Sequence, residues 1–273
     1  MPHAAIALLL MATLTGCGGE EVERSGATVA SAQLQSPSAR AMRLPLMRPA
    51  PIVAARADMR AADISVRVRI EGRIPADTAL QSGKYEPSCG ATMIDHLVAQ
   101  RGGALAGALV WIEGPTPIIA GAGVTEHRPT VAYQLCELLP RLQLASPGST
   151  LQLVMRDERA DSLVVVPAQP SLPIDTISFV TDGQLVPLRQ RAESAGVLGI
   201  HATRLPWARA YIAISSPGAA MITDVDGRAE FRVDASGTAT VVRAWHPSLG
   251  IVSATIDPSK GASEQVVTLT FKP

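Results

Sequence analysis

The histidines are the side chains of this chain best suited to general-base or metal chemistry, and they are scattered. Four of the five lie in the body of the chain, at His96, His127, His201 and His246. No Gly-x-Ser-x-Gly elbow, His-Glu-x-x-His pair or Walker loop accompanies them. Gly121-Ala122-Gly123 lacks the third glycine of a dinucleotide fingerprint. A catalytic triad could arise only through the fold, so the sequence predicts a protein that is not an enzyme.

Asp224-Val225-Asp226-Gly227 begins like a calcium-binding loop. The loop is not completed, because Ala235 stands at its twelfth position, where such loops place a Glu. Asp-Gly between apolar runs is typical of a hairpin turn, in which Asp accepts hydrogen bonds from backbone N–H groups and Gly adopts a positive φ. We therefore predict a turn at this place. Trp245-His246-Pro247 is interpreted in the same way, as a strand end with a structural histidine.

The composition excludes some classes of partner. Lys plus Arg and Asp plus Glu both number 24, so the formal charge of the 273-residue chain is zero. A neutral protein has no electrostatic footprint for nucleic acid, and we expect no nucleic-acid partner. Aromatic residues make up only 3% of the chain, so the core must be mainly aliphatic.

The hydrophobic pattern is that of short strands. Between 64 and 70 apolar residues alternate with polar ones, the period of a strand with one solvated face. Residues 105–112 form a nearly continuous apolar run, as expected of a strand buried on both faces. Val131 to Leu139 is the best candidate for a short helix. Many short strands with Gly and Pro between them predict an all-β, Greek-key β-sandwich.

The stretch from Leu205 to Gly250 contains the motifs of a family resemblance. It reads Pro206-Trp207, AYIAI, TDVDGRAEF and AWHPSLG, and it resembles the C-terminal half of bacterial cupredoxin-like proteins. These are periplasmic relatives of plastocyanin that include methylamine-utilisation and carboxypeptidase-regulatory-like proteins. RVRIEGRIP at 67–75 and GGALAGALVWIEG at 102–114 resemble upstream strands of the same family. The resemblance implies a cupredoxin-like sandwich over 63–273, with a transthyretin-like hairpin unit at 205–257.

The resemblance also implies where copper ligands would stand. A blue-copper centre needs two imidazoles, a thiolate and a weak axial Met. The first ligand position falls in the stretch 156–162, and the other three are aligned on Pro206-Trp207. In this chain the matching positions hold Asp161, Ala202, Leu205 and Ala208. None of these supplies the expected ligand, so we predict no copper and no other cofactor. His201 lies beside the loop and could bind a metal weakly with Asp161 or His246.

The N-terminal segment has the pattern of an export signal. Ala4 to Leu14 is an apolar run too short to span a bilayer and of the right length for a signal-peptide core. It ends in Leu14-Thr15-Gly16-Cys17, which resembles the lipobox of bacterial lipoproteins, where the signal is cut before an acylated Cys. We predict a signal peptide over 1–16 and lipidation of Cys17. An ordinary secretory signal with an incidental Cys is the alternative. Gly18, where Asp would favour inner-membrane retention, favours the outer membrane.

Two further cysteines, Cys89 and Cys136, fall where many members of the family carry cysteines. An exported chain with two remaining thiols most simply forms one disulfide. Closing this loop would stabilise the fold by about 4 kcal/mol in the chain-entropy model. A pair of metal thiolates is the alternative, but the CxxC spacing and nearby His of such a site are missing.

Residues 17–62 are rich in Ser, Pro and Ala without a sustained period, and they predict a disordered tether. The function predicted is that of a non-enzymatic, lipid-anchored cell-envelope protein. It would bind a partner or serve as a structural accessory of an envelope complex. The alternative is a copper-binding periplasmic electron carrier or chaperone.

Overall fold

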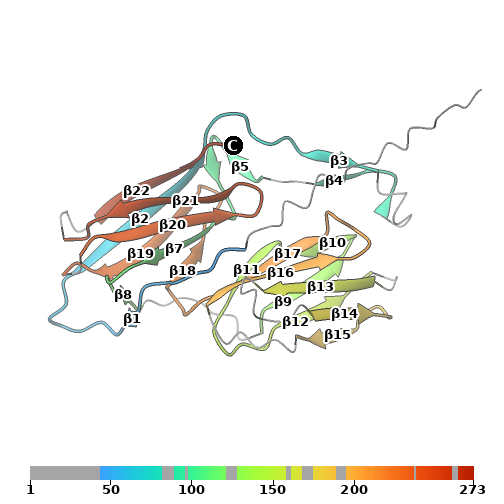
Figure 1. Cartoon of the computed structure of the whole chain (residues 1–273), viewed down its shortest axis with the longest axis horizontal. Coiled ribbons are helices and arrows are strands. Elements are labelled where there is room, and N and C mark those ends of the chain that lie inside the picture. Colours follow the sequence, from blue (N-terminus) through green and yellow to red (C-terminus); the bar gives the residue numbers. More distant parts are fainter. Residues whose placement is uncertain are drawn as a thin grey trace, which may run out of the picture. The chain divides into compact units, whose positions relative to one another are not determined.

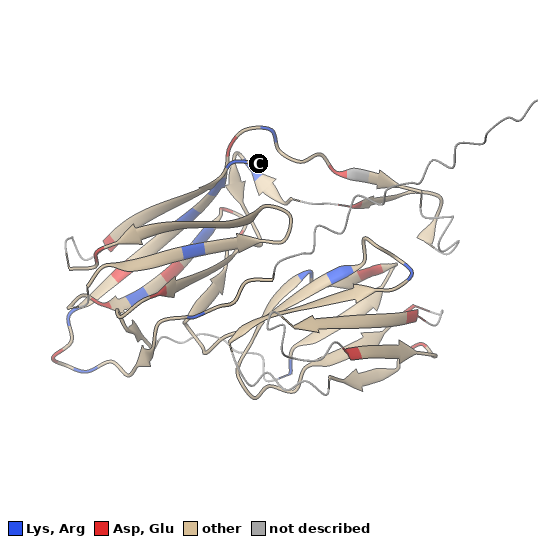
Figure 2. Cartoon of the chain, in the orientation of Figure 1, with Lys and Arg blue, Asp and Glu red and all other residues tan. Residues whose placement is uncertain are grey.

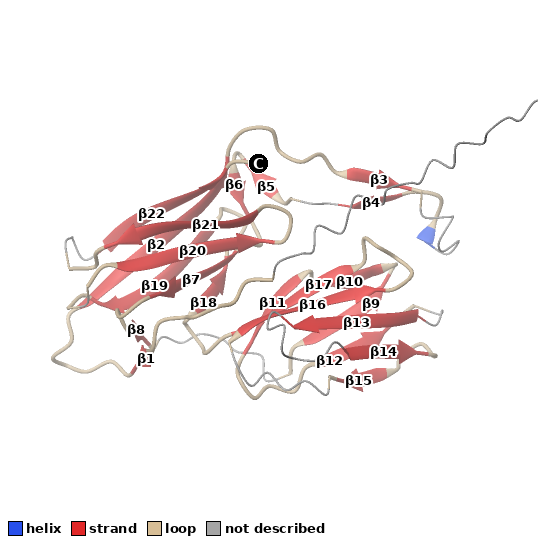
Figure 3. Cartoon of the chain, viewed as in Figure 1, coloured by secondary structure: helices blue, strands red, loops and turns tan. Residues whose placement is uncertain are grey.

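The computed structural model describes residues 44–81, 89–95, 98–120, 128–157, 161–167, 175–188, 195–236, 238–259 and 264–273. Its elements β1 to β22 are strands, which cover much of the described chain in Figure 3, and a single 3₁₀ residue is present at Cys89. The predicted all-β class is therefore confirmed. No helix in the described ranges is long and apolar enough to cross a membrane. The predicted signal, Cys17, His96, His127 and Gly121–Gly123 lie outside those ranges.

Two sheets form what we call the first sandwich. Its strands are β1 (Ile52–Val53), β2 (Ala61–Ile70), β5 (Gln100–Arg101), β6 (Ala104–Leu105), β7 (Leu109–Glu113), β8 (Ile118–Ile119), β18 (Ala220–Ile222), β19 (Arg228–Asp234), β20 (Thr240–His246), β21 (Gly250–Ile256) and β22 (Glu264–Phe271). One sheet has the order β1-β8-β19-β2-β6-β5, with β22 also paired to β2, and the other has the order β18-β7-β20-β21 (Figure 1). Strands from both ends of the described chain thus lie in one sandwich.

The strands between β8 and β18 form the second sandwich. They are β9 (Thr130–Gln134), β10 (Glu137–Leu139), β11 (Leu142–Ala145), β12 (Gln152–Met155), β13 (Asp161–Pro167), β14 (Asp175–Phe179), β15 (Leu185–Pro187), β16 (Gly196–Ala202) and β17 (Arg209–Ile214). Their sheets have the orders β10-β9-β12-β15 and β11-β17-β16-β13-β14. β3 (Thr78–Leu80) and β4 (Met93–Asp95) pair with each other in a separate two-stranded sheet.

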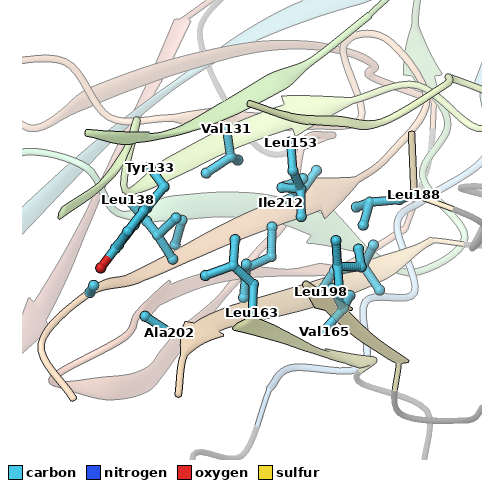
Figure 4. Close-up of a cluster of buried hydrophobic side chains, with 14 of the residues drawn as sticks. Val131, Tyr133, Leu138, Leu153, Leu163, Val165, Leu188, Leu198, Ala202 and Ile212 are labelled. Carbon is cyan, nitrogen blue, oxygen red and sulfur yellow. The ribbon is translucent and has the colours of Figure 1, made fainter. Parts of the chain in front are cut away.

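Each sandwich has its own apolar core, because strand periodicity turns alternate residues inward. In β2, Ile64, Val66, Val68 and Ile70 are all buried, as the alternation predicted. They pack with residues of β7, β19, β20 and β22. The core of the second sandwich draws on both of its sheets, and Figure 4 shows part of it, from Val131 and Leu153 to Leu163 and Ile212. A third cluster joins side chains of β7, β20, β16 and β17, including the edge-to-face rings of Tyr211 and Trp245.

The helix expected over Val131–Leu139 was wrong. This stretch forms the antiparallel hairpin of β9 and β10, in which Leu138 lies opposite Tyr133. Its burial alternates every second residue, so the apolar side chains fit a strand period and not a helical one. Leu135 and Cys136, at the turn, have positive φ angles of 51° and 62°. A helix cannot continue through two such residues.

Residues 205–257, predicted as one C-terminal hairpin unit, supply strands to both sandwiches. β17 pairs with β16 and β11 in the second sandwich. β18 and β20 pair with β7 in the first, and β21 pairs with β20. Strands that are neighbours in the sequence of this stretch therefore belong to different sheets.

Part of the segment assigned to the tether packs on the fold. Met47, Ala50 and Ala62 are each less than 5% exposed. The backbone N–H of Ala50 donates to the carbonyl of Ile112, and β1 pairs in parallel with β8. Packed structure therefore extends upstream of the predicted start at residue 63, as far as Leu44 in the described chain.

Candidate functional site

The structure brings the four positions that match the copper ligands together at one end of the second sandwich. Leu163 of β13 lies opposite Ala202 of β16, so Asp161 at the start of β13 reaches the loop that follows β16. Within that loop the N–H of Ala202 donates to the carbonyl of Ala208 at 2.9 Å, and the N–H of Ala208 donates to the carbonyl of Leu205 at 3.0 Å. The four positions that the alignment matched to copper ligands therefore lie at one end of the second sandwich.

Asp161 is buried there, with 6% of its surface exposed, and its carboxylate accepts three hydrogen bonds. The Tyr133 hydroxyl donates to Oδ2 at 3.0 Å. The backbone N–H of Ser162 and the hydroxyl of Thr203 donate to Oδ1 at 2.6 Å and 3.2 Å. Figure 4 shows the Tyr133 oxygen at the edge of the apolar cluster, toward the same end as Ala202. Asp161 therefore connects three strands or loops of the second sandwich by hydrogen bonds.

The donor set at this end does not fit a blue-copper centre. Ala202, Leu205 and Ala208 are each less than 9% exposed and belong to the apolar core. Aliphatic side chains have no lone pair to offer, and the remaining group is a hard carboxylate, which does not suit copper(I). Across the described ranges no three or more His, Cys, Asp or Glu side chains are grouped so that they could hold a metal ion.

His201 lies on the opposite face of β16 from Ala202. Ile200 and Ala202 belong to the core of the second sandwich, whereas the imidazole of His201 makes an edge contact with the ring of Tyr211. Burial, and secondarily the charge of Arg209, lowers the pKa of His201 from its ordinary value. The neutral imidazole is thus the favoured form, and the strand alternation directs it away from Asp161.

His246 has a structural place in the first sandwich, as its sequence context predicted. It ends β20, is 7% exposed, and its Nδ1 accepts a hydrogen bond from the N–H of Ser248 at 3.3 Å. Burial lowers its pKa to about 4. The turn predicted at Asp224–Gly227 is also confirmed, because Oδ1 of Asp224 accepts from the N–H groups of Asp226 and Arg228, both at 2.9 Å. The Asp224 carboxylate thereby closes its own turn.

The predicted disulfide between Cys89 and Cys136 is confirmed. It joins the segment that carries β3 and β4 to the β9–β10 turn of the second sandwich. That turn is held from two further sides. The Asp157 carboxylate accepts from the N–H groups of Leu135 and Cys136 at 2.7 Å and 2.9 Å. The indole of Trp207 donates to the carbonyl of Cys136 at 2.9 Å. The β9–β10 turn is therefore fixed beside the loop that holds the matched ligand positions.

A cluster of charged side chains beside the disulfide was not predicted. Asp95 of β4 is 5% exposed, and its carboxylate accepts from Arg209 at 2.6 Å and from Arg141 at 3.1 Å. Arg141 also approaches Glu137 at 3.4 Å. The two arginines lie 114 and 46 residues from Asp95 in the chain, so no local sequence pattern marks this cluster.

No protein-family model matches the chain, and no curated protein matches it in sequence. Solved structures that are similar to part of it are cupredoxins. A copper(I) form of an amicyanin mutant is 17% identical, with a TM-score of 0.28, over 39% of this chain and 98% of that one. A purple cupredoxin from Nitrosopumilus maritimus is 12% identical, with a TM-score of 0.26, over 32% of this chain and 99% of that one. A copper-containing nitrite reductase from Thermus scotoductus SA-01 is 13% identical, with a TM-score of 0.28, over 37% of this chain. The chain spans 25% of that reductase.

Proposed function

We propose that this chain is a non-enzymatic, lipid-anchored protein of the cell envelope whose cupredoxin-like domain has lost its copper ligands. In this proposal the domain binds a partner or supports an envelope complex, and the outer membrane is favoured over the inner one. The observation that carries it is the replacement of a ligand position by Asp161, a carboxylate engaged by Tyr133, Ser162 and Thr203.

An electron carrier needs a metal held by soft ligands at a site that partners can approach. Here three of the four positions are buried aliphatic side chains, and the fourth is a structural hydrogen-bond acceptor. The chemistry of the alternative function, a copper carrier or chaperone, has no support from these side chains. What remains is a stable β scaffold.

The membrane part of the proposal is supported by the sequence Leu14-Thr15-Gly16-Cys17 at the end of a signal-length apolar run. Each methylene of an acyl chain buried in the bilayer contributes about 0.8 kcal/mol. We expect the native protein to remain with membranes after a high-salt wash, and a Cys17→Ser variant whose residues 1–16 are replaced by an ordinary cleavable secretory signal to appear in the soluble fraction. Gly18→Ser, which leaves the thiol in place, is the matched control.

Mass spectrometry gives a second readout of the same proposal. The native protein should yield an N-terminal peptide that begins at Cys17 and carries the added mass of acyl chains. Identical fractionation of the native protein and Cys17→Ser after the salt wash would show that the lipoprotein assignment is wrong.

A further inference from the structure

The outward face of the larger sheet of the first sandwich divides into two ends of different charge. Strand alternation places Asp63, Ser65, Arg67 and Arg69 of β2 on this face, because the residues between them fill the core. In β19, the outward residues are Arg228, Glu230 and Arg232. β2 and β19 are antiparallel neighbours, so each outward residue of one strand has a defined partner on the other.

At one end of this ladder the charges are complementary. Arg232 lies opposite Asp63, and their charged groups are 3.9 Å apart. At the other end they are alike, because Arg228 lies directly opposite Arg67. Like charges opposite each other in an antiparallel pair destabilise a sheet. A sheet that keeps such a pair exposed has a place where an anion would be stabilising.

Two further arginines extend the positive end. Arg69 follows Arg67 on the same face of β2, and it lies opposite Ala104 of β6. Ala104 in turn pairs with Arg101 of β5. We call Arg67, Arg69, Arg101 and Arg228 the arginine patch, and all four are exposed. Figure 2 shows where Lys and Arg lie along β2 and its neighbours.

The acidic side chains near the patch leave it uncompensated. Within the described ranges, no Asp or Glu forms an ion pair with any of the four arginines. Glu230, the nearest acid of the ladder, lies opposite Ser65. Asp224 accepts from the backbone of its own turn. Among the described residues, Arg69 donates to the carbonyl of Gly102, at 3.4 Å. The exposed guanidinium groups of the patch therefore have no carboxylate partner among the described residues.

Beside the arginines, the neighbouring strand β22 contributes uncharged groups, whereas its acid, Glu264, lies beside Asp63 at the other end of the ladder. The strand pairs in parallel with β2, placing Val266 beside Ser65 and Thr268 beside Arg67. Val266 is 54% exposed. Guanidinium groups bind phosphate oxygens in a bidentate manner, hydroxyl groups can add hydrogen bonds, and an exposed apolar side chain suits the boundary between headgroups and acyl chains. A sheet face with this composition matches a surface of phosphates more closely than it matches a single acidic peptide.

We propose that the arginine patch binds the phosphate groups of anionic phospholipids, so that the β19–β2–β22 face rests on the membrane surface. The inference rests on the proposed lipid anchor for the presence of a bilayer beside the domain. The anchor would hold the protein at the membrane, and the patch would select which face the protein turns toward it. The partner is thus a lipid surface that carries negative charge.

The test uses the full chain carrying Cys17→Ser, so that no acyl chain contributes to binding. Sedimentation is measured with vesicles of phosphatidylcholine alone and with vesicles that also contain phosphatidylglycerol. The apolar segment at residues 4–14 contributes to both, so the readout is the difference between the two compositions. We expect preferential binding to the phosphatidylglycerol vesicles, and we expect this preference to weaken as salt is added.

Arg228→Gln and Arg232→Gln are a matched pair, because both remove one positive charge from the same face of β19. Near an anionic membrane surface each arginine contributes about a fivefold increase in partitioning. We expect Arg228→Gln to bind about fivefold more weakly and Arg67→Gln/Arg228→Gln about 25-fold more weakly. Arg232→Gln, which lies outside the patch beside Asp63, should lose clearly less than Arg228→Gln. Without lipid, Arg228→Gln should melt no lower than the parent, because it removes a like-charge pair.

Equal binding to both vesicle types, or equal losses in Arg228→Gln and Arg232→Gln, would overturn the assignment of the patch. Such a result would leave the lipid anchor standing, since every protein in this experiment lacks the acylated cysteine. Failure of the anchor would show instead in the fractionation of the native protein after the salt wash.

Discussion

The two sandwiches use their polar side chains in opposite ways. In the second, Asp161 and Asp157 receive hydrogen bonds from loops and strands at one end, and Arg209 of the same sandwich donates to Asp95 of β4. In the first, the charged residues of β2 and β19 stand on an outward sheet face, and the arginine patch has no acidic partner in the described chain. Buried carboxylates thus stabilise one end of the second sandwich, whereas the arginine patch of the first has no carboxylate partner among the described residues.

Under our proposal, this difference assigns recognition to the outward sheet face of the first sandwich. In the resembled family, the end of the cupredoxin-like sandwich is the place of the chemistry. Here that end is held in place by the hydrogen bonds of Asp161 and Trp207 and by the disulfide. Groups already engaged in this way lose their partners if they turn to a ligand. The unpaired charges of the first sandwich have no such cost.

The largest expected effect concerns the disulfide, which ties the β3–β4 segment to the second sandwich. The double variant Cys89→Ala/Cys136→Ala should lower the free energy of unfolding by about 4 kcal/mol, because the unfolded chain regains the freedom of a long closed loop. Urea denaturation of the oxidised protein measures this change, with Cys17→Ser as a control that leaves the pair intact. Two freely alkylated thiols in the native oxidised protein would contradict the bond itself.

The next effect tests the first sandwich through its buried histidine. Burial lowers the pKa of His246 to about 4, below the 6.5 of an unhindered imidazole. Between these values the unfolded chain binds the proton and the folded one does not, so stability is fully present above pH 6.5 and falls as the pH decreases toward 4. At 1.36 kcal/mol for each pKa unit, the loss amounts to about 3 kcal/mol.

Comparison with His246→Gln isolates this contribution from the other titrating groups. The free energy of unfolding of the native protein should fall more than that of the variant between pH 7 and pH 4, and the two should change in parallel above pH 7. Parallel curves over the whole range would mean that the imidazole titrates normally in the fold.

A smaller effect tests the assignment of Asp161 to structure. Asp161→Ala leaves the Tyr133 hydroxyl and the Ser162 N–H without their acceptor, which should cost about 2 kcal/mol of stability. Asp182→Ala, at an exposed turn of the same sandwich, should change stability by less than about 0.5 kcal/mol. Thermal unfolding of both variants makes the comparison. Equal unfolding midpoints would show that the hydrogen bonds of Asp161 do not stabilise the fold.

The sequence predicted features that depend on neighbouring residues. The alternation of β2, the Asp224–Gly227 turn and the β class all follow from local period and turn chemistry. The disulfide followed from counting thiols in an exported chain. The alignment on Pro206-Trp207 also gathered positions that the structure places together, because the loop between β16 and β17 closes on itself by hydrogen bonds.

Features that depend on contacts between distant residues could not be predicted from the sequence. The stretch 131–139 forms a hairpin whose turn is capped by Asp157, which lies 22 residues from Leu135, and a helical period and a strand period are hard to separate over so short a run. The Asp95 cluster joins side chains up to 114 residues apart. The arginine patch emerges only when the register of β2 on β19 sets Arg67 opposite Arg228.

The central claim, that the end holding Asp161, Ala202, Leu205 and Ala208 does not form a copper site, is tested most directly by titration with copper(II). Purified oxidised protein receives one equivalent of the metal while its visible absorption spectrum is recorded. A thiolate–copper bond gives a blue-copper centre its strong colour, and both cysteines of the described chain are joined in the disulfide. We predict no intense visible charge-transfer band. A strong band that saturates at one equivalent would contradict the account.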